Sequence, residues 1–309
     1  MKRPSVRPSR PAIAGLAGLT LLALTACAGG DPLSTDAGGA GDPGSGVTVG
    51  SADFPESQLL ATIYSLALQD AGVEVEERFN IGSREVYVEA VQDGSIDLVP
   101  DYSGALLKYL DTESTVSSTE DVLAELDDVL PDDLTVLDAS TAQNKDVLAV
   151  TRETAEEYNL ETISDLQPVA GELLLGGPPE WRTRVNGVVG LEDVYGLEFQ
   201  EFVPLDAGGT LTMTALTSGQ VQVGDLFSTD PGLDQNDLVA LEDDQSLFAA
   251  ENILPLVRSD MVDDTITTAL NEVSAALTTE DLIEMNGRAG TGESLSDIAT
   301  DWLTNAGLI

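Results

Sequence analysis

Two segments of the chain that lie 125 residues apart have the same pattern. Residues 90–103 (AVQDGSIDLVPDYS) align without gaps to residues 215–228 (ALTSGQVQVGDLFS). Each segment predicts the end of a helix, a glycine turn and a short buried strand, followed by an aromatic residue and a serine. Helix–glycine–strand is a common pattern, but the aromatic residues Tyr102 and Phe227 come at the same place after both strands. The match therefore favours a duplicated αβ unit.

Short apolar runs alternate with helix-length segments through much of the chain. The predicted strands are residues 47–50, 73–79, 96–99, 134–137, 147–150, 173–175, 199–203, 221–223 and 253–257. The predicted helices are 55–71, 83–93, one opened by the capping pattern Ser117-x-x-Glu120, and three within 262–308. This alternation predicts an α/β fold with mostly parallel sheets covered on both faces. A single doubly wound domain is the alternative, but the length and the number of strands favour two lobes.

The chain is strongly acidic and has no histidine. Of its 309 residues, 55 are Asp or Glu and 13 are Lys or Arg, which gives a formal charge of −42. Such a surface repels nucleic acid and anionic lipid, so both are poor partners; solubility at high salt is another reading of the charge. Without histidine, Ser-His-Asp catalysis and the commonest zinc ligand are excluded. No phosphate-binding glycine loop occurs, and we expect neither cofactor nor metal.

The first 46 residues predict export and attachment to a membrane. Residues 1–26 join four basic residues to an apolar stretch that is too short to span a bilayer. The next residue, Cys27, is the only cysteine of the chain and follows Leu24-Thr25-Ala26. This sequence resembles the lipobox of bacterial lipoproteins, whose cysteine is lipidated after signal-peptide cleavage; an ordinary secretory signal is the alternative. Residues 27–46 are rich in Gly, Asp, Ser and Pro and predict a flexible tether, which implies an extracytoplasmic, lipid-anchored body.

The two aromatic residues of the repeated segments predict a ligand site. In open α/β sheets, ligands bind beyond the carboxyl ends of the strands, so Tyr102 and Phe227 would face a crevice. If each lobe supplies one ring, the two can approach a ligand from opposite sides. Aromatic faces attract cations that lack hydrogen-bond donors, quaternary ammonium groups above all. The alternative is that both rings are core aromatics. Acids near the rings would make the crevice electronegative: Asp101, Asp206, Asp225 and Asp230.

A Gly/Pro-rich loop at residues 176–187 (GGPPEWRTRVNG) holds further candidates. Trp181 has little structural reason to lie in such a loop, although it could anchor a core. Arg182 and Arg184 stand out in a chain so poor in bases. Either could hold a ligand carboxylate through two hydrogen bonds, and either could instead pair with one of the many acids of the protein.

From residue 47 to the C-terminus, the sequence resembles the substrate-binding proteins of ABC importers for glycine betaine, choline, carnitine and related osmoprotectants. The most specific segments are DLVPDYSG at residues 97–104 and DLFSTDP at residues 225–231. The resemblance implies a type II periplasmic-binding-protein fold, in which two α/β lobes joined by two crossovers clamp a ligand in a cleft. It also implies binding instead of catalysis, with an ABC permease and its ATPase subunit as partners.

The resemblance further implies an aromatic box around the trimethylammonium head of the ligand. Tyr102 and Ser103 belong to the family's Pro-x-Tyr-[Ser/Thr]-Gly phrase. Phe227 and Thr229 belong to the second phrase, where the family often has tyrosine in place of Phe227. We expect ligand contacts from all four residues.

The chain departs from the family at two other places. Asp146 and Val188 stand where the family often has aromatic residues, so two walls of the box are missing unless Trp181 or Phe54 supplies one. An acid at position 146 favours a cation without a carboxylate, such as choline, over glycine betaine; a solute outside this set is the alternative. Asp146, Trp181, Phe54 and Arg184 complete the predicted ligand-binding residues.

The predicted lobes are discontinuous in sequence. The first comprises residues 47–144 plus 252–309, and the second comprises residues 145–251. Two other functions remain open at this point. One is a sensor or a binding domain of the same fold for a different solute. The more remote one is a carboxylate-pair hydrolase, which needs only two acids, although a glycosidase groove also needs a row of aromatics that this chain lacks.

Overall fold

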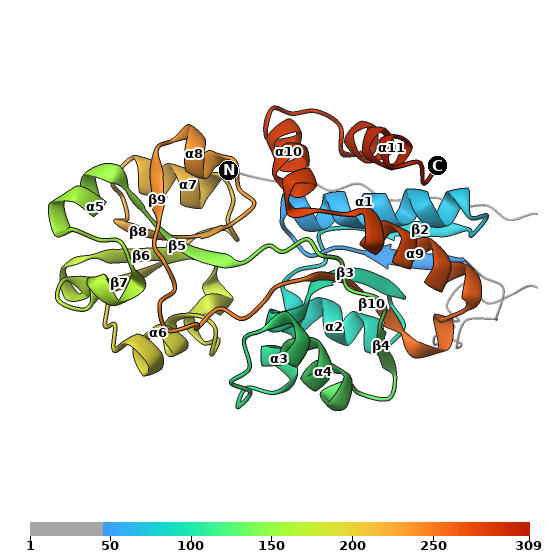
Figure 1. The fold of residues 1–309 in the computed structure, drawn as a ribbon, viewed down its shortest axis with the longest axis horizontal. Helices are drawn as coiled ribbons and strands as arrows, with labels where there is room; N and C mark the ends of the chain where they lie inside the picture. Colours follow the sequence, from blue (N-terminus) through green and yellow to red (C-terminus); the bar gives the residue numbers. More distant parts are fainter. Residues whose placement is uncertain (1–45) are drawn as a thin grey trace, which may run out of the picture. The chain divides into compact units, whose positions relative to one another are not determined.

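The computed structural model describes residues 46–309. Their strands form two five-stranded sheets with helices around them (Figure 1). The predicted signal peptide, the lipidation site Cys27 and the tether as far as residue 45 lie outside the described residues. No helix within residues 46–309 combines the length and the apolar character needed to cross a bilayer.

The first sheet has the strand order β2-β1-β3-β10-β4. β1 is parallel to β2 and β3, whereas β10 is antiparallel to β3 and β4. The chain thus returns from far along the sequence to add one antiparallel strand; we call this sheet with its helices the first lobe. The strands are β1 (Val47–Gly50), β2 (Val75–Arg78), β3 (Leu98–Tyr102), β4 (Leu134–Val136) and β10 (Ile253–Arg258).

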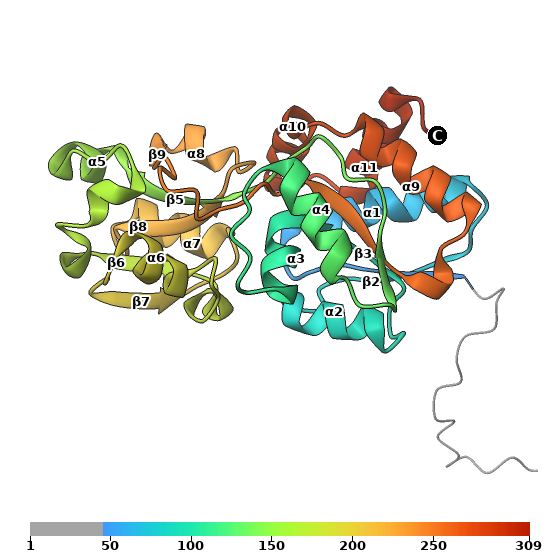
Figure 2. The ribbon, with the colours of Figure 1, turned by 60° about the horizontal axis from the view of Figure 1, so that its bottom comes forward.

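Helices cover both faces of the first sheet (Figure 2). Successive side chains along a strand point to opposite faces of the sheet, where they meet different helices. Leu98 and Ile253 pack with one group of helices, and Val99 and Leu254 pack with the other. The first group is α1 (Pro55–Asp70), α9 (Asp264–Ala276), α10 (Thr279–Gly290) and α11 (Leu295–Ala306); the second is α2 (Arg84–Gln92), α3 (Ser103–Leu110) and α4 (Thr119–Val129).

The second sheet has the equivalent order β7-β6-β8-β5-β9 and, with its helices, forms the second lobe. β6 is parallel to β7 and β8, and β5 is antiparallel to β8 and β9. Its strands are β5 (Asp146–Thr151), β6 (Leu174–Gly177), β7 (Glu201–Pro204), β8 (Val223–Phe227) and β9 (Leu238–Ala240). Its helices are α5 (Arg152–Tyr158), α6 (Val188–Tyr195), α7 (Thr210–Thr217) and α8 (Gly232–Gln235), and 3₁₀ turns lie at Ile163–Leu166, Ala170–Glu172 and Pro179–Arg182, with a further one at Ser259–Met261 in the first lobe.

The repeated sequence segments form the same unit in both lobes, which confirms the predicted duplication. β3 and β8 have identical lengths and lie at the same spacing as the sequence match. The glycine turn before each strand has left-handed backbone geometry, with φ of +76° at Gly94 and +75° at Gly219. Glycine adopts this conformation without the steric penalty of a side chain. Equivalent residues of the two lobes can therefore be compared directly.

The predicted ends of β3 and β8 were wrong. Tyr102 and Phe227 are the last residues of their strands and do not follow them. β3 continues through Pro100, which lies opposite Pro255 of β10. In an antiparallel ladder, alternate pairs exchange no hydrogen bonds, so two facing prolines at such a pair remove none between these strands.

Two details of the helices also differ from prediction. α3 begins directly after Tyr102 and was not predicted. The cap of α4 is Ser118, whose side chain accepts a hydrogen bond from the backbone N–H of Asp121, instead of Ser117. The choice between two adjacent serines depends on where the backbone first turns helical, which the capping pattern alone leaves open.

Two segments, residues 137–145 and 241–252, run between the sheets (Figure 1). Each enters its new sheet beside a serine of the repeated unit. The backbone N–H of Ser103 donates to the carbonyl of Asn252 at 3.0 Å, and that of Ser228 donates to the carbonyl of Lys145 at 2.9 Å. The segregation of the strands supports the proposed lobes, 47–144 plus 252–309 and 145–251.

Candidate ligand-binding site

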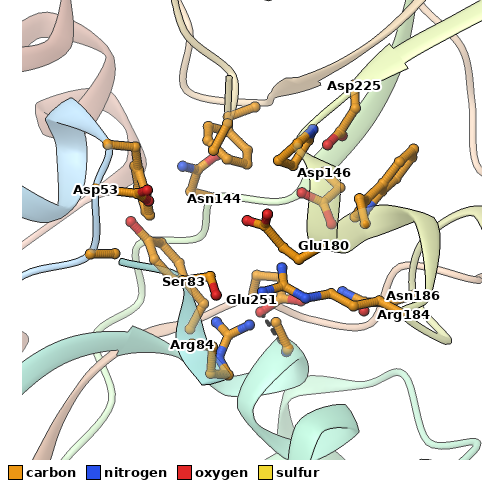
Figure 3. A pocket seen from close by; sticks show the side chains of 18 of the residues that line it. Asp53, Ser83, Arg84, Asn144, Asp146, Glu180, Arg184, Asn186, Asp225 and Glu251 are labelled. Atoms are coloured by element: carbon orange, nitrogen blue, oxygen red, sulfur yellow. Dashed lines mark hydrogen bonds between the residues drawn. The ribbon is translucent and has the colours of Figure 1, made fainter. Parts of the chain in front are cut away.

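A cavity is lined by the last residues of β3 and β8 and by neighbouring loops of both lobes (Figure 3). Its volume is about 80 Å³. Because one water needs roughly 10–15 Å³ on the same measure, the cavity suits a compact solute of several heavy atoms. Seven of the lining side chains are ionisable: Asp53, Asp146, Glu180, Asp225 and Glu251, with Arg84 and Arg184.

Three aromatic rings form one wall of this cavity. Phe54, directly before α1, lies between the other two: its ring centroid is 6.0 Å from that of Tyr102 and 5.4 Å from that of Phe227. Gly208 leaves room for the ring of Phe227, because a Cβ at this glycine would lie 2.4 Å from it. Its φ of +59° also favours glycine. We call these three residues the aromatic wall.

The hydroxyl of Tyr102 is held by Glu56, a buried acid in the first turn of α1. Glu56 accepts hydrogen bonds from the Tyr102 hydroxyl and the Asn144 amide at 2.7 Å each. It accepts two more, at 2.6 Å each, from the hydroxyl of Thr229 and the amide of Asn286. These donors come from β3, a connecting segment, the second lobe and α10. Glu56 thus ties the orientation of the Tyr102 ring to the contact between the lobes.

A second buried network supports the cavity from the first lobe. Asp101 is fully buried and forms a 2.7 Å ion pair with Arg84, whose side chain is 8% exposed. The hydroxyl of Tyr87 and the backbone N–H of Tyr102 also donate to Asp101, each at 2.8 Å. The charge of Asp101 is therefore balanced within the protein, and the guanidinium of Arg84 is already paired with it.

Arg184 forms an ion pair between the lobes. Its guanidinium donates two 2.9 Å hydrogen bonds to Glu85 of α2. Burial would raise the pKa of Glu85, but the hydrogen bonds from Arg184 and Ser83 outweigh it and lower this pKa to about 2. Arg184 lines the cavity, yet its guanidinium pairs with Glu85. Pairing with an acid of the protein was one of the two alternatives considered from the sequence.

Within residues 46–309, three acids of the cavity form no ion pair of the kind that Asp101 and Glu85 form. Burial raises the pKa of Asp146 to about 6, against the opposing charge of Arg184. Burial and the neighbouring Asp146 raise the pKa of Asp225 well above its ordinary value. Burial likewise raises the pKa of Glu251 to about 8, although its carboxylate accepts a 2.9 Å hydrogen bond from the backbone N–H of Ala105. This side of the cavity is therefore poorly solvated, and its acids hold their protons more tightly than free carboxyls do.

Trp181 combines both roles considered for it. It is 1% exposed, belongs to the core of the second lobe and stacks on Phe248 with ring centroids 6.4 Å apart. It also lines the cavity, where its indole N–H has no hydrogen-bond partner among residues 46–309. That N–H dipole nevertheless favours the charged form of Asp146 and so opposes the rise of its pKa.

Most of the predicted ligand-binding residues lie together. The cavity is lined by Phe54, Tyr102, Asp146, Trp181, Arg184 and Phe227. Ser103 and Thr229 do not line it: the hydroxyl of Ser103 donates to the carbonyl of Ala250, and that of Thr229 donates to Glu56. Both hydroxyls therefore stabilise the junction of the lobes. Of the four acids expected to charge the crevice, only Asp225 lines the cavity.

Sequence reasoning missed several residues of the site. Arg84, Glu180 and Glu251 line the cavity, and Glu56 supports it. A signal existed for Arg84, since it is one of few bases in the body of the chain. No signal marked the acids, because one carboxylate among so many has no distinguishing pattern.

The fold and the cavity together define a two-lobed solute-binding protein. Residues 45–305 match the family described as the substrate-binding domain of ABC-type glycine betaine transport systems. The chain belongs to this family.

Similar proteins agree with this assignment. The carnitine transport binding protein OpuCC of Listeria monocytogenes is 28% identical over 265 residues, which cover 83% of this chain and 85% of OpuCC. A glycine-betaine-binding protein of Pseudomonas aeruginosa is 28% identical over 228 residues, 69% of this chain and 72% of that protein. A crystal structure of a glycine betaine/carnitine/choline ABC transporter protein superimposes with a TM-score of 0.67 at 24% identity, covering 85% of this chain and 99% of that one.

These findings establish the class of the protein. It has the type II periplasmic-binding-protein fold, as predicted, and it is a substrate-binding protein of an ABC importer and not an enzyme. Proteins of this kind bind small solutes and work with a permease and an ATPase. The hydrolase hypothesis finds no support.

Proposed function

We propose that the protein captures a small quaternary ammonium solute, of the choline or glycine betaine type, outside the cytoplasm and delivers it to its importer. The aromatic wall carries this proposal, because Phe54 and Tyr102 come from the first lobe and Phe227 from the second. A cation lying on these rings would contact both lobes at once. Binding would then favour the conformation in which the lobes are together.

The charges of the cavity support a cationic ligand. Five acids and two arginines line it, and both arginines already pair with other acids. A methylated ammonium has no N–H groups to satisfy, so it loses little on leaving water for an aromatic surface. Each well-placed ring contributes about 0.5–2 kcal/mol to such binding. The names of similar proteins, which refer to carnitine, glycine betaine and choline, point to the same ligand class.

Calorimetric titration of the purified protein tests the proposal. Choline, glycine betaine and carnitine form the test panel, and ectoine and proline serve as solutes without a quaternary ammonium group. We expect saturable binding of at least one quaternary ammonium compound. A folded sample that binds none of them would overturn the proposed ligand class.

We further propose that lipidation of Cys27 attaches the protein to the outer face of the cell membrane. The position of this single cysteine after Leu24-Thr25-Ala26 supports the anchor. Fractionation of a bacterial host that expresses the full chain tests it. The wild-type chain should sediment with membranes, whereas Cys27→Ala should not; equal sedimentation of the two would contradict the anchor.

A further inference from the structure

Asp225 is buried without a partner. It is 1% exposed, it lines the cavity, and neither of its carboxylate oxygens has a hydrogen-bond partner among residues 46–309. Buried polar groups are nearly always satisfied, and an unsatisfied one costs folding free energy. In Figure 3 its carboxylate lies on the same side of the cavity as that of Asp146. The cavity thus presents hydrogen-bond acceptors that the protein itself does not use.

The sheet places the two acids next to each other. In the register of β5 and β8, Asp146 lies opposite Phe227, and Leu148 lies opposite Asp225. Asp146 and Asp225 are therefore diagonal neighbours on one face of the sheet, beside an aromatic-wall residue. Gly177 leaves room for Asp225, since a Cβ at this glycine would lie 3.2 Å from the Cβ of Asp225.

The surrounding charged groups do not neutralise the pair. Arg184 and Arg84 face these acids, but their hydrogen bonds go to Glu85 and Asp101. Glu180 adds negative charge beside Asp225, whereas Glu251, beside Asp146, has a pKa raised to about 8 and brings no positive charge either. The group able to complete this side of the cavity has to come from the ligand. No set of three or more acids or cysteines in the described part of the chain is placed to hold a metal ion.

We propose that Asp146 and Asp225 form an acceptor subsite for an O–H or N–H group at the far end of the quaternary ammonium ligand. The ligand is then an ammonium alcohol of the choline class, and not a zwitterion that ends in a carboxylate. This inference rests on the proposed function and refines it. The aromatic wall binds the methylated nitrogen, and the acid pair selects what lies at the other end. A carboxylate placed there would face the ionised Asp146 at neutral pH, and both nearby arginines are already paired with other acids.

Ligand selectivity in matched variants tests the subsite. In the wild-type protein, choline should bind at least tenfold more tightly than glycine betaine. Asp146→Asn and Asp225→Asn keep the shape of the pair but weaken it as an acceptor. Each should weaken choline binding about tenfold and leave glycine betaine binding unchanged or stronger. Thermal unfolding of each variant checks that it is folded.

The pH dependence supplies a measurement on the unaltered protein. Choline affinity should fall as the pH drops below about 6, because protonation removes the charge of Asp146 and weakens it as an acceptor, whereas glycine betaine affinity should not fall. Wild-type protein that binds glycine betaine as tightly as choline, or equal responses of both ligands to pH, would overturn the subsite while leaving the proposed function intact. Failure of every quaternary ammonium compound to bind would instead overturn the proposed function, and the subsite with it.

Discussion

The ends of β3 and β8 are equivalent positions in two copies of one unit, yet the acids at these ends differ in whether the protein supplies them with hydrogen-bond partners. In the first lobe, Asp101 precedes the ring-bearing Tyr102 and is satisfied by Arg84 and Tyr87. In the second lobe the acid, Asp225, stands one residue earlier in the repeat and has no partner. Successive side chains of a strand point to opposite faces, so this shift places Asp225 on the same face as Phe227, whereas Asp101 lies on the face opposite to Tyr102.

The residue that lies opposite each ring in the sheet also differs between the lobes: it is apolar in the first and acidic in the second. Tyr102 lies opposite Ile253, whereas Phe227 lies opposite Asp146. In the first lobe, the polar groups around the ring are therefore satisfied within the protein: the hydroxyl of Tyr102 donates a hydrogen bond to Glu56. The second lobe leaves an acid close to its ring, Asp225, without a hydrogen-bond partner in the described part of the chain. Under the proposed function, the unit of the first lobe positions the ligand, whereas the unit of the second lobe also selects it.

Removing the acid of the first lobe should have the largest effect. Asp101→Ala would leave Arg84 buried without its ion-pair partner. We expect a loss of about 3–5 kcal/mol in the free energy of unfolding, the usual result of breaking a buried pair. Urea unfolding followed by circular dichroism measures it. A loss below about 1 kcal/mol would show that the first lobe does not depend on this network.

Removing the ring of the first lobe should weaken ligand binding. Tyr102→Ala deletes part of the aromatic wall and should reduce the binding free energy of choline by about 1–3 kcal/mol. Tyr102→Phe is the matched control, since it keeps the ring and loses only the hydrogen bond to Glu56. Calorimetry should find the control much closer to the wild type. Identical affinities of all three proteins would place the ligand elsewhere.

Removing the acid of the second lobe should stabilise the free protein at neutral pH. Burial and Asp146 raise the pKa of Asp225 in the folded state, so the folded state holds this proton more tightly than the unfolded state. The protonated Asp225 therefore costs the folded state no ionisation penalty below the ordinary aspartate pKa. As the pH rises above that value, the unfolded state ionises first and the free energy of unfolding falls. Asp225→Asn cannot ionise, so it should be more stable than the wild type at pH 8, by about 1–2 kcal/mol.

The same variant should lose this advantage in acid. At pH 4 both proteins carry a neutral side chain at this position, so their melting temperatures should converge. Thermal unfolding at the two pH values measures the difference. A variant that is less stable than the wild type at pH 8 would mean that the second lobe satisfies its acid after all.

Making the two rings alike should have the smallest effect. Phe227→Tyr adds the hydroxyl that the equivalent residue Tyr102 carries, and phenyl and phenol faces attract cations similarly. Choline affinity should change by about 0.5 kcal/mol or less. Phe227→Leu is the contrasting variant, because it keeps apolar volume but removes the aromatic face, and it should weaken binding by more. Equal affinities for the leucine and tyrosine variants would argue that Phe227 acts only by packing.

The sequence contained enough to predict the fold and the rings, but not the partners of the charged groups. Tyr102 and Phe227 could be found because a repeat places them at equivalent strand ends. Glu56 could not, because an acid in the first turn of a helix looks like any other such acid until donors from four distant segments converge on it. The pairing of Arg184 with Glu85 likewise joins residues that are far apart in sequence, and only the approach of the lobes brings them together.

A crystal structure of the protein with choline would test the aromatic wall and the acid pair together. We predict that the quaternary nitrogen lies against the aromatic wall, within about 6 Å of the ring centroids of Phe54, Tyr102 and Phe227, as cation–π contact requires. We also predict that the hydroxyl of choline lies at hydrogen-bond distance from Asp146 or Asp225. A nitrogen lying away from these three rings, with the rings packed only on one another, would contradict it.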